Sequence, residues 1–439
     1  MFRPANLARV SLCILLALVG LRAYGEEYYS DHGFAMDLPE GFELIDGDGQ
    51  TRYSFGSPDG AVRVDVAVYP ASRFATAQAG AADTMRRISG RGDFLAFPYG
   101  GIDAAIGEIS IAAGGDALKG LGLFLNDVAP VAKPQAAAPS GAGAAAPLYD
   151  MVVLAYAPAA SYDRYHDVIV SSVDGLSANY GRRAVPGPVG AAVRSTLGQP
   201  KPVAVTIRFG SASIRSSWLP DEATVAQELV EREYRVLSAY AQSPELIDAA
   251  VARFYRMIYR DAAPSLDRLA LDMSMAWETG AWAGKAAPPT LLDGSTTGTP
   301  PSDAPKPATV GPRYGTTANP RAYAEAVLAW VQSFTYERNP EGSDVVNPIT
   351  AAFQGRGDCD SRALVMAILL RRENIDAIMM VSLKHEHALA AIDAPGSGAR
   401  FPFKDKRWLV AETTARVGIG LIDAGQADPS DWIGVAFPR

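Results

Sequence analysis

Cysteine and histidine are scarce in this sequence of 439 residues, which has two cysteines and four histidines. One cysteine, Cys13, lies in an N-terminal segment that we expect to be removed, so the remaining chain carries Cys359 alone and forms no internal disulfide. Zinc ligands need more cysteine or histidine at regular spacing than this chain offers, and we expect no metal. Stability therefore has to come from a hydrophobic core, for which a hydrophobic content of 48% is sufficient.

Long apolar runs are also rare. Val10–Leu21 is strongly apolar, but its twelve residues are too few to span a bilayer comfortably. Basic residues precede this run and Ala23-Tyr24-Gly25 follows it, a pattern typical of a secretory signal peptide. We therefore predict a signal peptide over residues 1–25, a periplasmic or extracellular protein, and no integral membrane segment after cleavage. Cys13 lacks the context of a lipidation site, so no lipoprotein is predicted.

Basic charge is in deficit. Without the three Arg of the predicted signal peptide, the chain has 37 basic and 48 acidic residues, a net charge of −11. A surface this acidic is poorly suited to nucleic acid as the main partner, and we predict none. No motif calls for a nucleotide, haem or nicotinamide group, so we expect no cofactor.

Residues 26–181 have the pattern of an antiparallel sheet combined with a helix. Alternating apolar and polar residues in Thr51–Gly56 and Ala61–Tyr69 flank turn residues, which predicts a hairpin. Thr76–Ile88 is predicted to be helical. Residues 129–147 are rich in Ala, Pro and Gly, and we predict a flexible insert between two strands of this domain.

The segment GFAMDLPEGFELIDGD, residues 33–48, followed by strands, one helix and more strands, is similar to PsbP-like domains. The resemblance implies a non-catalytic binding or docking module, which could engage a partner protein of the cell envelope. His32 and His166 have no cysteine or second histidine nearby in sequence and are predicted to be structural.

The middle of the chain is predicted to be mostly helical. Four prolines in residues 182–202 indicate a linker. Residues 203–284 are predicted to form a strand and amphipathic helices packed on the C-terminal core, with aromatic residues such as Tyr255 in the core. Residues 285–317, dense in Pro, Gly, Ser and Thr, predict a flexible loop. With residues 318–439 as a C-terminal α+β core, the whole chain is predicted to be α+β.

The stretch Gly355-Arg356-Gly357-Asp358-Cys359-Asp360, followed by an apolar run, is the most informative in the chain. It predicts a helix that begins at or beside the cysteine, with Asp358 or Asp360 as its cap. The positive end of a helix favours a thiolate, whereas adjacent carboxylates act in the opposite direction. We predict Cys359 to be a nucleophile. The residues alone also allow a small buried hydrophobic side chain on a packed helix.

His387 and Glu412 lie on or after two predicted strands that follow this helix. A neutral imidazole can take the thiol proton, and a carboxylate on its other nitrogen can fix the tautomer, so Cys359, His387 and Glu412 form a candidate nucleophile, base and orienting acid. His385 would lie on the same strand face as His387, so alternation alone does not choose between them. Asp393 is an alternative acid. The histidine pair does not complete the spacing of a metal site.

The segments AWVQSFTYE, GRGDCDSRALVMAILLRRENIDA, HEHALAAID and RWLVAETT resemble the transglutaminase-like superfamily, whose core shares the papain-type arrangement. The resembling stretch runs from about Asn319 to Ala415. The resemblance implies that Cys359 is the nucleophile, His387 the base and Glu412 the acid. Aspartate is usual at the third position, and the extra methylene of glutamate has to be absorbed by the backbone.

Two functions are compatible with these residues. The first is thiol-dependent acyl transfer on peptide or protein amide bonds, in which water as acceptor gives a cysteine peptidase or amidase and an amine gives a transglutaminase. The oxyanion would be held by the Cys359 N–H and one further donor, with Gln354 and Trp330 as candidates and Asp358 as an auxiliary residue. The second is a catalytically silent scaffold or binding protein of the cell envelope, because most of the chain shows no chemistry.

Overall fold

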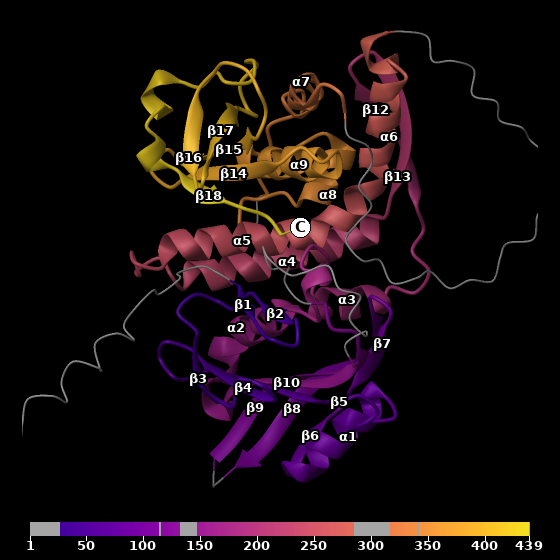
Figure 1. Cartoon of the computed structure of the whole chain (residues 1–439), viewed down its shortest axis with the longest axis vertical. Helices are drawn as coiled ribbons and strands as arrows, with labels where there is room; N and C mark the ends of the chain where they lie inside the picture. Colours follow the sequence, from indigo (N-terminus) through magenta and orange to yellow (C-terminus); the bar gives the residue numbers. More distant parts are fainter. Residues whose placement is uncertain (1–26, 114–115, 132–146, 285–316, 340–341, 439) are drawn as a thin grey trace, which may run out of the picture.

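The described residues of the computed structural model are 27–113, 116–131, 147–284, 317–339 and 342–438. The predicted signal peptide lies outside them, as do most of the predicted insert 129–147 and of the predicted loop 285–317. The architecture is α+β, as predicted. An N-terminal sheet, a layer of helices and a C-terminal sheet with its helices follow one another along the long axis of the molecule (Figure 1).

The N-terminal sheet is antiparallel in all its described pairings. Its strands are β3 (Glu43–Gly47), β4 (Arg52–Gly56), β5 (Arg63–Pro70), β6 (Gly90–Gly92), β7 (Leu95–Tyr99), β8 (Ile102–Ala113), β9 (Asp116–Val128) and β10 (Tyr149–Pro158). Their order is β3-β4-β5-β10-β9-β8-β6, and β7 also pairs with β8. The predicted insert therefore joins two neighbouring strands, β9 and β10. A second, small sheet consists of β1 (Tyr28–Tyr29), β2 (Ala35–Met36) and β11 (Leu176–Ser177).

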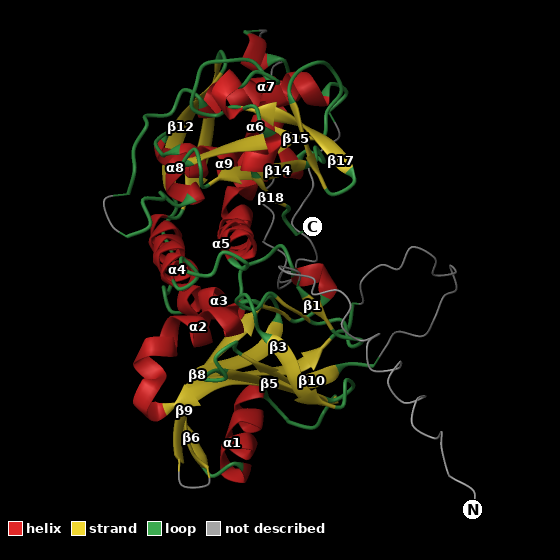
Figure 2. Ribbon diagram, turned by 90° about the vertical axis from the view of Figure 1, so that its left-hand side faces the viewer, coloured by secondary structure: helices red, strands yellow, loops and turns green. Residues whose placement is uncertain are grey.

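Helices cover both faces of the large sheet (Figure 2). Helix α1 (Ala77–Arg87) packs with Val152 on one face, and α2 (Tyr162–Asp174) packs with Val153 on the other. Adjacent residues of β10 point to opposite faces because a strand has a side-chain period of two. The predicted hairpin β4–β5 and the predicted helix over 76–88 are confirmed, and Thr76 caps α1 by accepting from the Ala79 N–H.

The segment 182–202 is not only a linker, because it contains helix α3 (Pro188–Ser195). Its prolines pointed to extended chain, but Pro188 occupies the first helical position, where no backbone N–H is needed. The carboxylate of Asp174 accepts from the N–H groups of Val189 and Gly190 and so satisfies the start of the helix. Arg194 then binds Asp261 through two hydrogen bonds of 2.7 Å.

A layer of helices separates the two sheets. After the hairpin β12 (Val203–Phe209) and β13 (Ala212–Trp218) come α4 (Pro220–Ser238), α5 (Ile247–Ala262) and α6 (Asp267–Glu278). Figure 1 shows α4 and α5 running between the N-terminal lobe and the C-terminal core. Short 3₁₀ turns lie at 159–161, 180–182, 263–266, 281–283, 424–426 and 429–431.

The C-terminal core is a five-stranded antiparallel sheet packed on a buried helix. Its elements are α7 (Pro320–Val331), α8 (Pro348–Gln354), α9 (Cys359–Arg372), β14 (Ala377–Ser382), β15 (His387–Ile392), β16 (Arg400–Phe403), β17 (Lys406–Ala411) and β18 (Ile433–Val435), with strand order β16-β17-β15-β14-β18. Almost every residue of α9 is buried. One face of the sheet packs on α9, and the other forms a separate cluster around Phe401 and Trp432.

Charged side chains are buried where the N-terminal lobe meets α4 and α5. The Asp37 carboxylate accepts two hydrogen bonds from Arg256, at 2.8 and 2.9 Å. Arg253 donates to the Asp37 carbonyl and, at 2.9 Å, to the Glu233 carboxylate. Arg232 links Glu233 to Asp174. Because each of these charges has an opposite partner, the desolvation cost of burying them is offset only while the network is complete.

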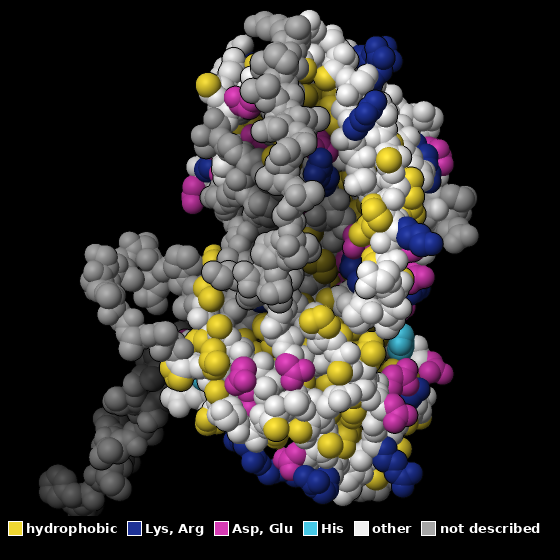
Figure 3. Space-filling model, turned by 90° about the vertical axis from the view of Figure 1, so that its right-hand side faces the viewer, with side chains coloured by type: hydrophobic (Ala, Val, Ile, Leu, Met, Phe, Trp, Pro, Cys, Tyr) yellow, Lys and Arg dark blue, Asp and Glu magenta, His cyan; other side chains and the backbone are white. Residues whose placement is uncertain are grey.

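Charged side chains at the surface are more evenly mixed. On the face shown in Figure 3, acidic and basic side chains of the described residues are interspersed over both lobes. Among the described residues, none of the helices combines the length and the apolar character needed to cross a bilayer.

Asp37→Asn tests the buried network. The change leaves Arg256 buried without its carboxylate and removes the second of two carboxylates near Arg253, so we expect it to lower the free energy of unfolding by about 3–5 kcal/mol at pH 7, measured by urea denaturation. Burial raises the pKa of Asp37, but Arg256 and Arg253 outweigh burial and hold the pKa below its ordinary value. The stabilisation is therefore present above the unfolded pKa of about 3.9 and is lost as the pH falls through the folded pKa.

The difference in free energy of unfolding between wild type and Asp37→Asn should accordingly shrink below about pH 4. Asp83→Asn is the matched control, since Asp83 pairs with Arg86 and Arg87 on the surface of α1. This variant should lose much less free energy of unfolding, because exposed ion pairs contribute little. Equal urea midpoints for wild type and Asp37→Asn would contradict the role of the network.

Candidate active site

A tight turn places Cys359 at the first position of α9. Helix α8 ends in Gly355, whose φ of 62° lies in the left-handed region that favours glycine. A Cβ on Gly357 would meet the Ser361 Cβ at 2.7 Å, so this position also requires glycine. Of the two predicted candidates, Asp358 caps α9 and accepts from the Ser361 N–H at 2.9 Å and hydroxyl at 2.7 Å.

The thiol lies beside the strand that carries His387. Cys359 is 5% exposed, and its sulfur accepts a hydrogen bond from the backbone N–H of Ala388 on β15. Helix α9 packs along β15 and β14, so the contact is held by the core of the domain. The nucleophile and base predicted from the sequence are thus on adjacent elements, with the sulfur one residue from His387.

His387 and Glu412 contact each other directly. The Nε2 atom of His387 is 2.7 Å from Oε2 of Glu412. The other carboxylate oxygen accepts from the Thr414 N–H at 2.7 Å and hydroxyl at 2.6 Å, and the Gln332 amide donates to the Glu412 carbonyl. This contact uses Nε2 and does not involve the Nδ1 atom of the imidazole.

The Glu412 carboxyl is held in its charged form. Burial raises its pKa, but hydrogen bonds from His387 and Thr414 outweigh burial and lower the pKa below its ordinary value. The two alternatives left open by the sequence lie elsewhere. Asp393 pairs with Lys406 at 2.5 Å, and His385 lies 3.1 Å from Asp431. Both are thus engaged in pairs of their own.

The electrostatics of the thiol differ from the helix-terminus expectation. Burial raises the pKa of Cys359 well above its ordinary value, and the charges of Asp360 and Asp358 raise it further. Hydrogen bonds from the N–H groups of Ala388 and Asp360 lower it only in part. The resting form is therefore the thiol, because loss of water around a thiolate outweighs the dipole of α9.

Tyr255 is a neighbour of the site that sequence reasoning placed in the general core. It lies on α5, and its hydroxyl donates to Oδ1 of Asp360 at 2.8 Å. Burial and the charge of Asp358 raise the pKa of Asp360 to about 7, against the lowering effect of Tyr255 and His387. The only sequence signal was an aromatic residue at helical spacing, which does not identify a partner 105 residues away.

The two oxyanion candidates have other contacts. The Gln354 side chain accepts from Arg356 at 2.7 Å, and Trp330 packs edge-on against Phe334 in the core. Among the described residues, neither is seen hydrogen-bonded to the sulfur or to His387. Residues 335–337 pair with residues 355–357 through backbone hydrogen bonds. Tyr336 therefore lies beside the turn that precedes α9.

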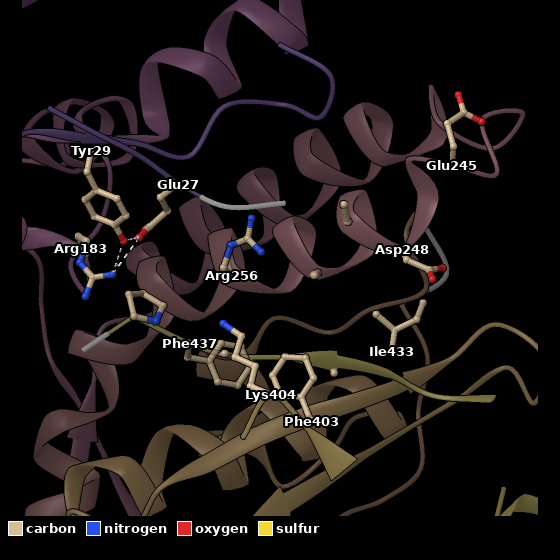
Figure 4. Close-up of a pocket in the computed structure, with 15 residues that line it drawn as sticks. Glu27, Tyr29, Arg183, Glu245, Asp248, Arg256, Phe403, Lys404, Ile433 and Phe437 are labelled. Carbon is tan, nitrogen blue, oxygen red and sulfur yellow. Dashed lines mark hydrogen bonds and ion pairs between the residues drawn. The ribbon is translucent and has the colours of Figure 1, made fainter. Parts of the chain in front are cut away.

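A cavity of about 490 Å³ lies apart from these residues, where the N-terminal lobe, α5 and the C-terminal core meet (Figure 4). Arg183, Arg256 and Lys404 line it together with Phe403 and Phe437. Arg183 binds Glu27, and Arg256 binds Asp37, so both guanidinium groups are already paired. Within the described ranges, no group of three or more His, Cys, Asp or Glu side chains is arranged to hold a metal ion.

Comparisons with known proteins agree with the C-terminal part of this description. Residues 309–413 match the family model of the Transglutaminase-like superfamily, and this segment contains Cys359, His387 and Glu412. A search of curated proteins gives no match.

Similar solved structures include the cyanobacterial PsbP (CyanoP) from Synechocystis sp. PCC 6803, with 12% identity, 36% of this chain and 94% of that chain covered, and a TM-score of 0.26. LpqN, involved in cell envelope biogenesis of Mycobacterium tuberculosis, has 10% identity and a TM-score of 0.22, and the match covers 35% of this chain and 88% of LpqN. A protein from Bacteroides thetaiotaomicron VPI-5482 has 9% identity, coverages of 60% and 95%, and a TM-score of 0.23.

The buried thiol should react slowly in the native protein. In the full chain with Cys13→Ser, we expect iodoacetamide to alkylate Cys359 at least about tenfold more slowly at pH 8 than in urea, since each pKa unit is a tenfold change in thiolate. Because the folded pKa is raised, the native rate should still be rising at pH 10. A native rate that levels off below pH 8 would mean that a thiolate exists at rest. Intact mass gives both rates.

Proposed function

We propose that the chain is an exported thiol-dependent acyl-transfer enzyme that acts on amide bonds of peptides or proteins. Cys359 is the nucleophile, His387 the base and Glu412 the acid that orients the imidazole. The observation that carries the proposal is the 2.7 Å contact of His387 with Glu412 beside a buried sulfur, within a segment that matches the transglutaminase-like superfamily. Residues 318–439 form the catalytic unit in this proposal, and residues 203–284 pack against it.

The first half of the reaction forms a thioester. As the sulfur of Cys359 bonds to the amide carbon, its proton passes to Nδ1 of His387, and Glu412 stabilises the resulting imidazolium. Since the resting sulfur is a thiol, proton transfer accompanies attack. His387 then gives the proton to the departing amine as the C–N bond breaks. The Cys359 N–H at the helix start is a proposed donor to the oxyanion.

The second half restores the thiol. Water attacks the thioester carbon and loses its proton to His387, the C–S bond breaks, and the proton returns to the sulfur while a carboxylic acid leaves. An amine in place of water gives a new amide, which is transamidation. We propose hydrolysis as the main reaction, by a cysteine peptidase or amidase.

One observation favours a second function. Cys359 is 5% exposed and its pKa is raised, as for a structural cysteine. In this alternative the chain is a catalytically silent scaffold of the cell envelope, and the N-terminal lobe is a docking module for a partner protein.

Amide turnover separates the two functions. We expect the full chain to release amine from members of a peptide-amide library, Cys359→Ala to release none, and His387→Ala to lose about 10²–10⁴-fold in kcat/KM. Glu412→Gln should lose activity as well, because the imidazole loses the group that fixes its tautomer. The measurement is amine release, with and without added methylamine as a competing acceptor.

His385→Ala is the matched control, since His385 lies two residues from His387 but contacts Asp431. It should keep activity close to wild type. Equal loss in both histidine variants would remove the assignment of His387. If wild type and Cys359→Ala are equally inactive across the library, the scaffold function replaces the enzyme.

A further inference from the structure

Helix α5 lies outside the segment that matches the transglutaminase-like superfamily, yet it contributes a side chain to the start of α9. Tyr255 is 6% exposed, and its hydroxyl donates to Oδ1 of Asp360 at 2.8 Å. A buried tyrosine hydroxyl needs a partner, and this one has a carboxyl group as its acceptor. Burial and nearby acidic groups raise the pKa of Tyr255 well above its ordinary value, so the hydroxyl keeps its proton and stays a donor.

Asp360 is the second residue of α9 and directly follows the nucleophile. Several titratable or charged groups on four parts of the chain face it: Asp358 and Cys359 from α9, Tyr255 from α5, His387 from β15, and Arg338 from the segment before α8. Its carboxyl group therefore interacts electrostatically with both the sulfur and the imidazole of the proposed reaction. Neither step of the mechanism above assigns it a task.

We propose that Tyr255 is a positioning residue of the thiol site, whose hydroxyl holds the Asp360 carboxyl beside Cys359 and His387 and so sets the charge next to the nucleophile. The catalytic role of this contact rests on the function proposed above, but its effect on the thiol can be tested without measuring turnover. It makes α5 a part of the active site as well as a packing element.

The consequence is a charge that changes near neutral pH. Burial and the charge of Asp358 raise the pKa of Asp360 to about 7, while the hydrogen bond from Tyr255 lowers it. The charged form of Asp360 in turn raises the pKa of Cys359. Removing the hydroxyl raises the pKa of Asp360 further, so this carboxyl stays neutral in part of the range where it is charged in the wild type. The thiol then ionises more readily in that range.

The test is the rate of iodoacetamide alkylation between pH 6 and 9 in the full chain with Cys13→Ser. Tyr255→Phe should react up to about three- to tenfold faster than wild type at about pH 8, where the Asp360 carboxyl is mostly charged in the wild type, since a neighbouring like charge shifts a pKa by one unit or more. Asp360→Asn should show at least this increase and keep it at higher pH, because asparagine is never charged. Tyr255→Phe in the Asp360→Asn background should add nothing, because the hydroxyl acts through that carboxyl.

Tyr259→Phe is the matched control on the same helix. Tyr259 is 2% exposed and also hydrogen-bonded, but its hydroxyl accepts from Nε of Arg371 at 3.0 Å. In Tyr259→Phe, the alkylation rate of Cys359 should depend on pH as in the wild type. Urea midpoints check that each variant is folded. The proposal is overturned if Tyr255→Phe follows wild type, or if it changes the rate equally with and without the Asp360 carboxyl.

This outcome is separate from that of the proposed function. If the chain shows no amide turnover, a shift of the alkylation profile in Tyr255→Phe still supports the role of Tyr255. If turnover depends on Cys359 but Tyr255→Phe does not change the alkylation profile, the role of Tyr255 is overturned and the proposed function stands.

Discussion

The burial of the first turn of α9 against β15 is the constraint on which the rest of the site depends. It brings the Cys359 sulfur to the N–H of Ala388 and thus to the strand of His387. The same burial removes the water that would stabilise a thiolate, and the neighbouring carboxyl groups add to this effect. The burial that positions the Cys359 sulfur therefore also makes its thiolate less stable. In the reaction proposed above, the thiol therefore loses its proton as it attacks, and accepting that proton is the task that the proposal gives to His387.

Glu412 is fixed in position along its whole length. Glu412 follows β17 directly, and both of its oxygens are used, one by His387 and one by the backbone and hydroxyl of Thr414. Gln332, at the end of α7, holds the Glu412 carbonyl. The longer side chain is thus fixed at both ends. In this position the carboxylate reaches the imidazole at 2.7 Å.

Local features of the fold and of the candidate site could be predicted because short-range chemistry decides them. The glycines before Asp358, the cap itself and the start of α9 at Cys359 all follow from residues within one turn of each other. The strands β15 and β17 after this helix, and the contact of His387 with Glu412, could be predicted because their apolar runs follow one another in the sequence and resemble a known family pattern.

Long-range packing decided what could not be predicted. Helix α3 depends on Asp174, which is distant enough in sequence that the prolines alone pointed to a linker. Gln354 is close to Cys359 in sequence, but its side chain turns toward Arg356. The charge state of Cys359 depends on how deeply α9 is buried, and no local pattern encodes that depth. The contact of Tyr255 with Asp360 belongs to the same class.

Helix α5 ties these long-range effects together because it has two differently occupied faces. Arg253, Arg256 and Arg260 follow one another at helical spacing and bind the N-terminal lobe through Asp37 and the backbone of β11 and its neighbours. Tyr255 and Tyr259, one turn apart, face α9. A single rigid helix therefore connects the buried ion pairs of the lobe to the carboxyl group beside the thiol.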